Sequence, residues 1–278
     1  MKKVKRLHDV KESRRLLLTQ DTAFAVKEAY LKLRTSLTFC MCKDKAMPCK
    51  SFLVTSSNSA EGKSVATANI AISFAMLGKK TLIIDCDMRK PMQKKLWKME
   101  IENGIAEHLA NIGKCEFGKV GGDFPLYICG CNRIPSNPTE MLSSESMKAL
   151  INELYDKFDY IFIDTPPVNT VVDAQIIAPL VDGVVIVSKS GFTMRDELQL
   201  SVRLMEEAGA NICGVVLNQI DFKSGKGYGK YSYRYGYRYG YRYGYRYGYR
   251  YGYRNGKGGY HYDDSYGYYS SDNNEDKL

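Results

Sequence analysis

The feature that most constrains the fold is a short loop between an apolar run and a helix-like segment. The apolar run covers residues 52–54, and the segment 65–77 is rich in Ala, Ile and Phe. The loop between them ends in Gly62, Lys63 and Ser64. A strand, a small-residue loop, Gly-Lys-Ser and a helix together bind phosphate through backbone N–H groups and the helix N-terminus. Lys63 would contact the β- and γ-phosphates, and the Ser64 hydroxyl would ligate Mg²⁺.

This loop supplies most of the expected nucleotide-binding residues. They are Ser57, Asn58, Ser59, Ala60, Glu61, Gly62, Lys63, Ser64 and Val65. Ser57 stands where the general pattern GxxxxGK[ST] has its first glycine, so the loop departs from the pattern at that one position. The alternative explanation is a chance Gly-Lys-Ser in front of a helix.

Strand-like and helix-like segments alternate along the chain. The predicted strands are residues 52–55, 81–84, 126–129, 160–163, 183–188 and 212–217, and the predicted helices are residues 23–37, 65–77, 138–158 and 195–208. Most of these strands are continuous apolar runs, as expected for strands buried on both faces. We therefore expect an α/β fold of the P-loop NTPase type, with a mostly parallel sheet flanked by helices.

The composition divides the chain into three parts. Residues 1–22 are charged and are expected to form a flexible segment, and residues 23–222 have a normal globular composition. Residues 223–278 are dominated by Tyr, Gly and Arg, with few aliphatic side chains, so we expect a disordered tail. Within the globular part, Val26, Ala29, Tyr30, Leu33 and Leu37 lie on one face of the first predicted helix.

Aspartates follow two of the predicted strands. Asp85 and Asp87 come after the strand 81–84, and Asp164 comes after the strand 160–163. Ligands of open parallel sheets bind at the carboxyl ends of the strands, where these side chains would converge with the phosphate loop. The alternative is that each aspartate is an ordinary turn or cap residue.

Carboxylates and hydroxyls are suitable Mg²⁺ ligands, so Ser64, Asp85, Asp87 and Asp164 are the expected metal ligands. One of Asp85 and Asp87 would hold the metal while the other accepts a proton from an attacking hydroxyl. The sequence leaves both assignments open. Arg89 either stabilises developing charge or pairs with a neighbouring side chain.

The net charge of +9 is unevenly distributed. Residues 223–254 contain nine basic residues and no acid, whereas residues 255–278 carry a net charge of −3. About +3 is left for residues 1–222, because 9 − 9 + 3 = 3. The basic balance therefore belongs to the tail, and it does not indicate a nucleic-acid-binding face on the globular part.

Within the tail, tyrosine occupies every odd position of a four-residue repeat. These tyrosines are Tyr231, Tyr233, Tyr235, Tyr237, Tyr239, Tyr241, Tyr243, Tyr245, Tyr247, Tyr249, Tyr251 and Tyr253. A strand would place all of them on one face, and interleaved Arg and Tyr would also suit base stacking. We expect them to be phosphate acceptors, and we expect no specific nucleic-acid partner.

Eight cysteines are present, and none forms a CxxC pair. This pattern argues against a zinc ribbon, and reduced thiols in a cytosolic protein are expected. The basic N-terminus lacks the apolar segment of a signal peptide, and no apolar run reaches the length of about 18–20 residues that spans a membrane.

Three motifs together resemble the bacterial tyrosine kinases of capsule and exopolysaccharide synthesis, of the CapB/CpsD type. They are the loop 57–64 with a small first residue, three aliphatic residues before Asp-x-Asp-x-Arg at 85–89, and three apolar residues before Asp-x-Pro-Pro at 164–167. Their order and spacing are highly specific, and the resemblance covers the chain from about residue 28 to the tail. Partition-type ATPases carry Lys at the position of Asn58, so Asn58 argues against that related group.

The resemblance implies an ATP- and Mg²⁺-dependent protein tyrosine kinase. Its catalytic residues would be Lys63, Asp85, Asp87, Arg89 and Asp164. Asn218 resembles the adenine-recognising Asn of the superfamily, although a strand-end Asn in a turn is an equal alternative. The tail tyrosines would be phosphorylated by a neighbouring copy, and the activity would regulate capsular or exopolysaccharide synthesis or export.

The resemblance also implies partners. A membrane-spanning activator of the polysaccharide copolymerase type would recruit a cytoplasmic kinase to the inner face of the plasma membrane, and a tyrosine phosphatase would reverse the reaction. The family forms a subunit ring through a helix with Glu, Arg and Arg at three-residue spacing. Here these positions are Glu28, Leu31 and Arg34, so Glu28 and Arg34 are the expected oligomerisation residues. The competing hypothesis is an ATP-switched scaffold whose basic tail binds anionic partners without kinase chemistry.

Overall fold

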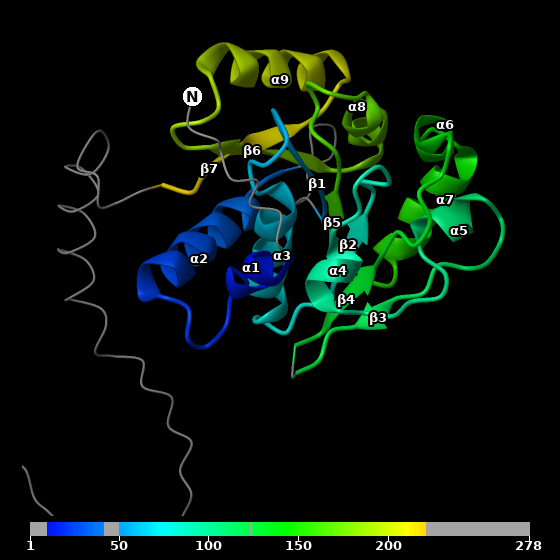
Figure 1. Ribbon diagram of the computed structural model, residues 1–278, viewed down its shortest axis with the longest axis horizontal. Coiled ribbons are helices and arrows are strands. Elements are labelled where there is room, and N and C mark those ends of the chain that lie inside the picture. The colour runs from blue at the N-terminus through cyan, green and yellow to red at the C-terminus, as the bar shows by residue number, and fades with distance from the viewer. Residues whose placement is uncertain (1–9, 42–49, 123, 221–278) are drawn as a thin grey trace, which may run out of the picture. The chain divides into compact units, whose positions relative to one another are not determined.

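The computed structural model describes residues 10–41, 50–122 and 124–220 (Figure 1). These residues all belong to one structural unit, which ends at Asp221. The expectations for residues 1–9 and for the tail, including every predicted phosphate acceptor, lie outside the described residues.

A sheet with the strand order β3-β4-β2-β5-β1-β6-β7 forms the centre of this unit. All neighbouring strands run parallel except β3 and β4, which pair antiparallel. The strands are β1 (Ser51–Ser56), β2 (Thr81–Asp85), β3 (Gly118–Lys119), β4 (Leu126–Cys129), β5 (Tyr160–Asp164), β6 (Gly183–Lys189) and β7 (Ile212–Asn218). The prediction of a mostly parallel sheet flanked by helices is confirmed.

Helices cover both faces of this sheet because the central strands are apolar on both sides. Alternate residues of β1 lie in different core clusters, with Leu53 in one and Phe52 and Val54 in the other. The first cluster contains side chains of α5 (Ile105–Leu109), α6 (Pro138–Leu142), α7 (Glu145–Tyr155), α8 (Asp173–Ile177) and α9 (Arg195–Glu207). The second contains side chains of α2 (Phe24–Thr38), α3 (Lys63–Ala75) and α4 (Gln93–Trp97).

The predicted helix 138–158 is wrong as a single element, because the chain forms α6 and α7 instead. Ser144 separates them in an extended conformation (φ −72°, ψ 156°). Its hydroxyl accepts a hydrogen bond from the Met147 N–H at 3.3 Å, which caps α7. A serine that satisfies an N–H group at a helix start favours a new helix over continuation of the preceding one.

Part of the stretch 1–22, which was expected to be flexible, forms defined structure from Val10 onward. A short helix, α1 (Val10–Arg15), precedes a stretch anchored to α3. The Asn69 side chain accepts from the Leu18 N–H at 2.8 Å and donates to the Leu16 carbonyl at 2.9 Å. The buried Asn69 amide thus holds the N-terminal segment to α3 through one backbone N–H and one backbone carbonyl.

Helix α2 packs only through its C-terminal half. Leu37 is buried, and Tyr30 and Leu33 pack against the core, as the predicted apolar face requires. Val26 is 41% exposed, so the N-terminal part of that face is open. Arg34 donates to the Ser73 carbonyl at 2.6 Å and so ties α2 to α3.

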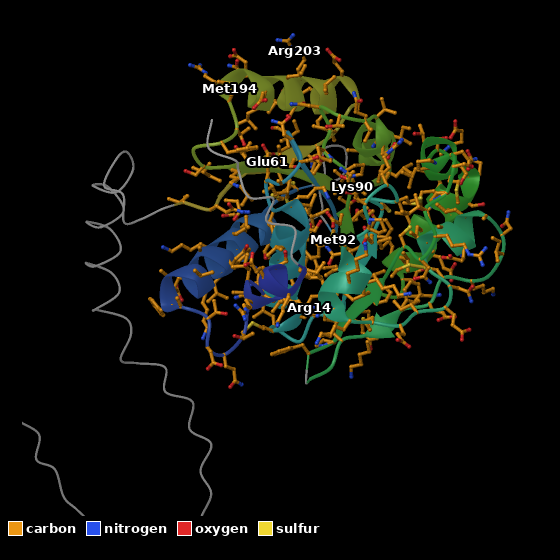
Figure 2. The ribbon with its side chains drawn as sticks, in the orientation of Figure 1. Arg14, Glu61, Lys90, Met92, Met194 and Arg203 are labelled. Carbon is orange, nitrogen blue, oxygen red and sulfur yellow. A yellow bond between two sulfur atoms is a disulfide. The ribbon has the colours of Figure 1, made fainter. Side chains whose placement is uncertain are left out.

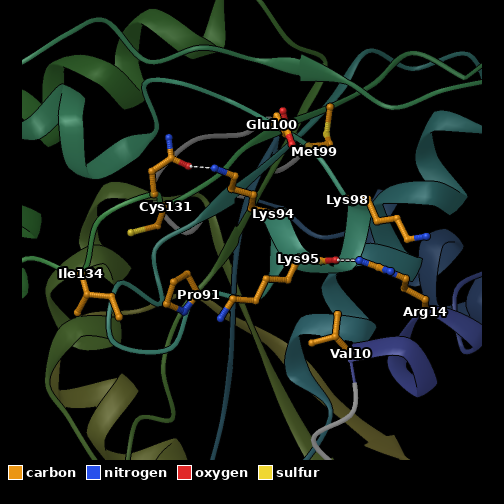
Figure 3. Close-up of a pocket in the computed structure, with 11 residues that line it drawn as sticks. Val10, Arg14, Pro91, Lys94, Lys95, Lys98, Met99, Glu100, Cys131 and Ile134 are labelled. Carbon is orange, nitrogen blue, oxygen red and sulfur yellow. Dashed lines mark hydrogen bonds between the residues drawn. The ribbon is translucent and has the colours of Figure 1, made fainter.

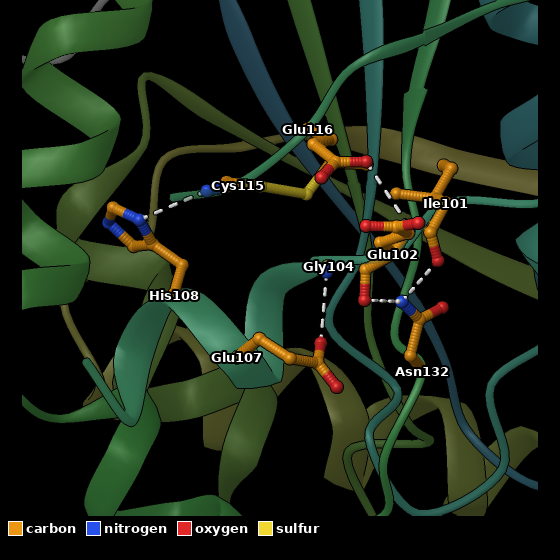
Figure 4. The surroundings of a disulfide bond; sticks show 9 residues. Ile101, Glu102, Gly104, Glu107, His108, Cys115, Glu116 and Asn132 are labelled. Atoms are coloured by element: carbon orange, nitrogen blue, oxygen red, sulfur yellow. Dashed lines mark hydrogen bonds between the residues drawn. A yellow bond between two sulfur atoms is a disulfide. The ribbon is translucent and has the colours of Figure 1, made fainter. Parts of the chain in front are cut away.

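The structure joins Cys115 and Cys129 in a disulfide, which corrects the expectation of reduced thiols at these positions (Figure 4). Cys129 ends β4, and Cys115 lies in the segment that leads into β3. The antiparallel pairing of β3 with β4 returns this segment to β4 and brings the two cysteines together. Cys86 and Cys131 remain buried thiols. In the part of the chain that the structure describes, no helix is both long and apolar enough to cross a bilayer.

Candidate active site

The candidate site lies at the carboxyl ends of β1, β5 and β2, which are neighbours in the sheet. Strand β1 leads into the phosphate loop, whereas β2 and β5 end at Asp85 and Asp164. The parallel register pairs Asp85 directly with Asp164. The two carboxylates are therefore placed side by side by strand pairing, at the position where parallel sheets bind ligands.

The phosphate loop leads directly into α3, which begins at Lys63, two residues before the predicted start. Gly62 precedes it with φ 86°, and a Cβ atom there would lie 2.5 Å from Asn218 Nδ2. Both the backbone conformation and the lack of space require glycine at this position. Ala60 also has a positive φ, at 67°. Ser59 and Ala60 are exposed, and Val65 lies half-buried in the first turn of α3.

Hydrogen bonds to three other elements hold the loop in this shape. Glu61, labelled in Figure 2, is buried, and its carboxylate accepts from the Thr193 hydroxyl at 2.5 Å and from the Asn58 N–H at 3.1 Å. Burial raises the pKa of Glu61, and these hydrogen bonds oppose that shift. The buried Ser57 hydroxyl lies 2.7 Å from the Ser201 hydroxyl of α9. Ser57 therefore anchors the loop to α9.

Asn218, at the end of β7, also contacts the loop. Its amide donates to the Glu61 carbonyl at 2.9 Å, and its Oδ1 accepts from the Gln219 N–H at 2.9 Å. Of the two interpretations of Asn218, these bonds match the residue that ends a strand and orders a turn. Recognition of adenine by Asn218 stays a prediction.

Lys63 lies among all three aspartates. Its Nζ donates to Asp87 Oδ2 at 2.8 Å, and Asp164 Oδ1 is 3.6 Å away. The lysine side chain is only 12% exposed. Burial lowers the pKa of Lys63, but the negative charges of Asp164 and Asp87 outweigh burial, so the pKa is raised and the lysine is held as a cation.

Asp85 and Asp164 each keep one buried oxygen without a hydrogen-bond partner among the described residues, namely Oδ1 in both cases. The other oxygen of Asp85 accepts from the Met92 and Gln93 N–H groups, each at 2.8 Å. Burial and the neighbouring Asp164 charge raise the pKa of Asp85 to about 8. Burial also raises the pKa of Asp164, and the charge of Lys63 opposes that rise.

The Asp164 oxygen that accepts no hydrogen bond within the described ranges, together with the Ser64 hydroxyl at the start of α3, suits a Mg²⁺ ion. No group of three or more His, Cys, Asp or Glu side chains with metal-binding geometry occurs among the residues described. Mg²⁺ does not need such a cage, because one or two carboxylates, substrate phosphates and waters complete its shell. The donor set therefore fits Mg²⁺ bound together with a nucleotide.

Sequence reasoning missed Gln93, which connects the parts of the site. Its side-chain amide donates to Asp164 Oδ2 at 2.9 Å and to the Ser64 carbonyl at 3.0 Å, while its own N–H holds Asp85. Gln93 is completely buried and is the first residue of α4. A lone Gln at the start of a short helix carries no sequence signal for this role, although it follows Asp85 by only eight residues.

Arg89 pairs with a buried carboxylate. Its Nε and Nη2 donate to the two oxygens of Asp173, at 2.9 and 3.1 Å, and Nη2 also contacts the Thr139 hydroxyl at 3.0 Å. Asp173 is fully buried, whereas the Arg89 side chain is 39% exposed. Of the two roles left open for Arg89, the structure shows the pairing role. Asp173 and Thr139 were not expected from the sequence.

Comparison with known proteins gives consistent matches. A family model described as "AAA domain" matches residues 54–204. The chain is 34% identical over 209 residues to the putative tyrosine-protein kinase CapB of Staphylococcus aureus, covering 74% of this chain and 90% of CapB. It is 35% identical over 205 residues to the tyrosine-protein kinase YwqD of Bacillus subtilis (strain 168), covering 73% of this chain and 85% of YwqD.

A solved structure is also similar over most of its length. The kinase domain of the Escherichia coli tyrosine kinase ETK matches with a TM-score of 0.68 and 28% sequence identity, covering 73% of this chain and 79% of that domain. The family match spans more than half of the chain, and both curated relatives are matched over most of their own length. This chain therefore belongs to the family of bacterial tyrosine-protein kinases that includes CapB and YwqD.

Proposed function

We propose that the chain transfers the γ-phosphoryl group of ATP to tyrosine hydroxyls in the tail of a second copy. The observation that carries this proposal is the buried Lys63 among three carboxylates at the carboxyl ends of β2 and β5, next to a phosphate loop. In the reaction, the tyrosine oxygen forms a bond to the γ-phosphorus, and the bond from the γ-phosphorus to the bridging oxygen breaks. ADP leaves with the electron pair of that bond, and the hydroxyl proton passes to a carboxylate.

Asp85 is the carboxylate that we assign as proton acceptor. Both oxygens of Asp87 are used, one by Lys63 and the other by the Lys90 N–H at 3.0 Å. Asp85 is aimed by two backbone N–H groups and keeps Oδ1 for a proton. Burial and the neighbouring Asp164 charge raise its pKa, which makes the ionised Asp85 carboxylate a stronger base than an ordinary one.

Ser64 and Asp164 would hold Mg²⁺ in this scheme, with Asp85 and Asp87 beside it. When bound, the ion would neutralise charge on the phosphate oxygens. Lys63 contributes a fixed positive charge close to the phosphates, and Gln93 keeps Asp164 and Ser64 in place. Catalysis would then come from positioning and charge stabilisation, which dominate phosphoryl transfer.

The tail tyrosines are the proposed acceptors because a flexible tail reaches a neighbouring subunit. About 56 residues of flexible chain have a root-mean-square reach of about 40 Å. We call the tyrosines of residues 231–253 the tyrosine ladder. Its phosphorylation is a proposal, and so is the oligomer that brings two copies together. Glu28, on α2, is the proposed contact of that oligomer, while Arg34 also ties α2 to α3 within the chain.

The proposed cellular role is based on membership of the family. We propose that a membrane-spanning partner of the polysaccharide copolymerase type activates the kinase and recruits it to the inner face of the plasma membrane. Tail phosphorylation would then regulate capsular or exopolysaccharide synthesis, and a tyrosine phosphatase would reset it.

The test uses two full-length chains that differ in size by a tag. The tagged chain carries Lys63→Met, so it can receive phosphate but not transfer it, and the untagged chain is wild type. Phosphotyrosine on the tagged chain after incubation with Mg-ATP is the expected result. ATP hydrolysis without phosphotyrosine on either chain would instead favour the nucleotide-switched scaffold.

A further inference from the structure

Beside the candidate active site lies a second feature, a pocket of about 870 Å³ (Figure 3). Helices α1 and α4 and the loop after β4 form its walls. Its lining includes Arg14, Pro91, Lys94, Lys95, Lys98 and Cys131. We call this feature the basic pocket, because four of its lining residues are cations and only one, Glu100, is an acid.

Two of the cations of the basic pocket, Arg14 and Lys94, are held in place by uncharged hydrogen-bond acceptors. Arg14 donates to the backbone carbonyls of Leu96, at 3.0 Å, and of Lys95. Lys94 donates to Asn132 Oδ1 at 2.8 Å. Within the described ranges, none of the four cations forms an ion pair with a carboxylate. A cavity lined by four cations and a single acid favours an anionic ligand.

The same loop forms a wall of the basic pocket and holds the catalytic carboxylates. Pro91 lines the pocket, and it follows Lys90, whose N–H binds Asp87. Met92, the next residue, donates its N–H to Asp85. Lys90 and Met92 are labelled in Figure 2. A peptide bound in the basic pocket would therefore lie against the loop whose N–H groups hold the proposed proton acceptor, Asp85.

The chain's own sequence contains two tyrosine-bearing stretches of opposite charge. Residues 223–254 carry +9, whereas residues 260–278 contain five acids and one lysine, a net charge of −4. The acidic stretch includes Tyr266, Tyr268 and Tyr269. A cationic pocket repels the first stretch and attracts the second.

We propose that the basic pocket binds residues 260–278 of a second copy, so that Tyr266, Tyr268 and Tyr269 are phosphorylated before the tyrosines of residues 231–253. This inference rests on the proposed function and adds an order of acceptors to it. The charge of the pocket selects residues 260–278 as the first acceptor segment, and the tyrosine ladder of residues 231–253 is phosphorylated later.

The first experiment maps phosphotyrosines by mass spectrometry during a time course with Mg-ATP. It compares full-length wild type, Lys95→Glu/Lys98→Glu and the control Lys79→Glu, an exposed lysine in the turn before β2. Wild type and the control should modify the acidic stretch first. The double variant should modify it about tenfold more slowly, as reversal of two exposed charges predicts, with no loss at the ladder. The same order and rates in all three proteins would overturn the proposal.

A charge-swap chain provides an independent check. Asp263→Lys/Asp264→Lys in the tail of the Lys95→Glu/Lys98→Glu protein should restore early phosphorylation of Tyr266. This rescue requires that the two charged regions meet, so a merely structural defect would not show it. Failure of the rescue, together with normal phosphorylation of the ladder, would count against the pocket.

Binding is measured separately from chemistry, without ATP. A fluorescent peptide of residues 260–278 should bind the full-length protein, and Lys95→Glu/Lys98→Glu should weaken this binding about tenfold. If binding shows this dependence but no protein forms phosphotyrosine, the proposed kinase reaction fails and the pocket assignment stands. If phosphatidylserine vesicles bind through Lys95 and Lys98 and the peptide does not, the pocket is a membrane contact and the proposal is overturned.

Discussion

The carboxylate cluster of Lys63, Asp85, Asp87 and Asp164 and the basic pocket lie close together in the chain but use charge in opposite ways. In the cluster the charges are buried and face one another, with Lys63 2.8 Å from Asp87. In the basic pocket, Lys95 and Lys98 are exposed and have no carboxylate partner among the described residues. In the carboxylate cluster the charges hold one another in position, whereas in the basic pocket they are available to a ligand.

This difference predicts where substitutions will act. Charges that lie in a low-dielectric interior interact strongly, and losing one leaves the others without compensation. Charges that face solvent contribute little to folding and act mainly on association. Substitutions in the carboxylate cluster should therefore affect chemistry and stability, and substitutions in the basic pocket should affect recognition alone.

The largest effect is expected for Asp164→Asn. The rate of phosphotyrosine formation should fall about 100–1000-fold, because a preorganised charge at the transfer site is lost. Asparagine keeps an oxygen for the Gln93 hydrogen bond, so the fold should persist. Initial rates at saturating Mg-ATP measure the effect, with Asp156→Asn, an exposed residue at the end of α7, as the matched control. A loss of less than about tenfold would remove Asp164 from the site.

Lys63→Met should lower the free energy of unfolding by about 3 kcal/mol, because the buried carboxylates lose their counter-charge. The loss should depend on pH. The pKa of Asp85 is raised to about 8, so the stability linked to its protonated form is present at acid pH and is lost as the pH rises through that value. Urea denaturation should therefore show the greatest loss near pH 9 and the smallest near pH 5. A loss that grows toward acid pH would contradict this electrostatic account.

An asymmetric result is expected for the pair Arg89–Asp173, which links the loop after β2 to α8. Arg89→Ala should cost about 2 kcal/mol, because among the described residues it leaves the buried Asp173 with the Thr139 hydroxyl as its remaining side-chain partner. Asp173→Ala should cost about 1 kcal/mol, since the partly exposed Arg89 regains water. Chemical denaturation of both single variants and the double variant tests this order. Equal costs would show that burial of Asp173 does not decide the energetics.

The smallest effects are expected for Lys95→Ala and Lys98→Ala. Each should change the free energy of unfolding by less than about 0.5 kcal/mol, because neither side chain is buried or ion-paired within the described part of the chain. The same denaturation series measures them. A loss above about 1 kcal/mol would mean that the basic pocket is part of the folded core, and the contrast between the two regions would disappear.

Much of the fold was predictable because its signals are local. Continuous apolar runs mark buried strands, and the small-residue loop before a helix marks the phosphate site. The carboxyl-end positions of Asp85 and Asp164 follow directly from these runs. The break at Ser144 was missed because a serine within an apolar helical pattern caps a helix only when its own backbone is extended, as it is here.

The partners that complete the site were not predictable, because they come from distant parts of the chain. Gln93 reaches Asp164, Asp173 reaches Arg89, and Ser201 reaches Ser57. Nothing in the neighbouring sequence of these residues distinguishes them from ordinary polar positions. The disulfide between Cys115 and Cys129 was missed for the same reason, since antiparallel pairing of β3 brings the two together.

The strand-helix alternation, the phosphate loop, the aspartates behind two strands and the tyrosine-rich tail can all be read from the residues alone, because each depends on the order of residues over a short range. Three outcomes depend instead on the folded chain: which oxygens of those aspartates are already used, the pairing of Arg89 with Asp173, and the contact of Arg14 with α4 in the basic pocket. Those outcomes depend on strand register and helix packing, which place side chains from remote segments within hydrogen-bonding distance.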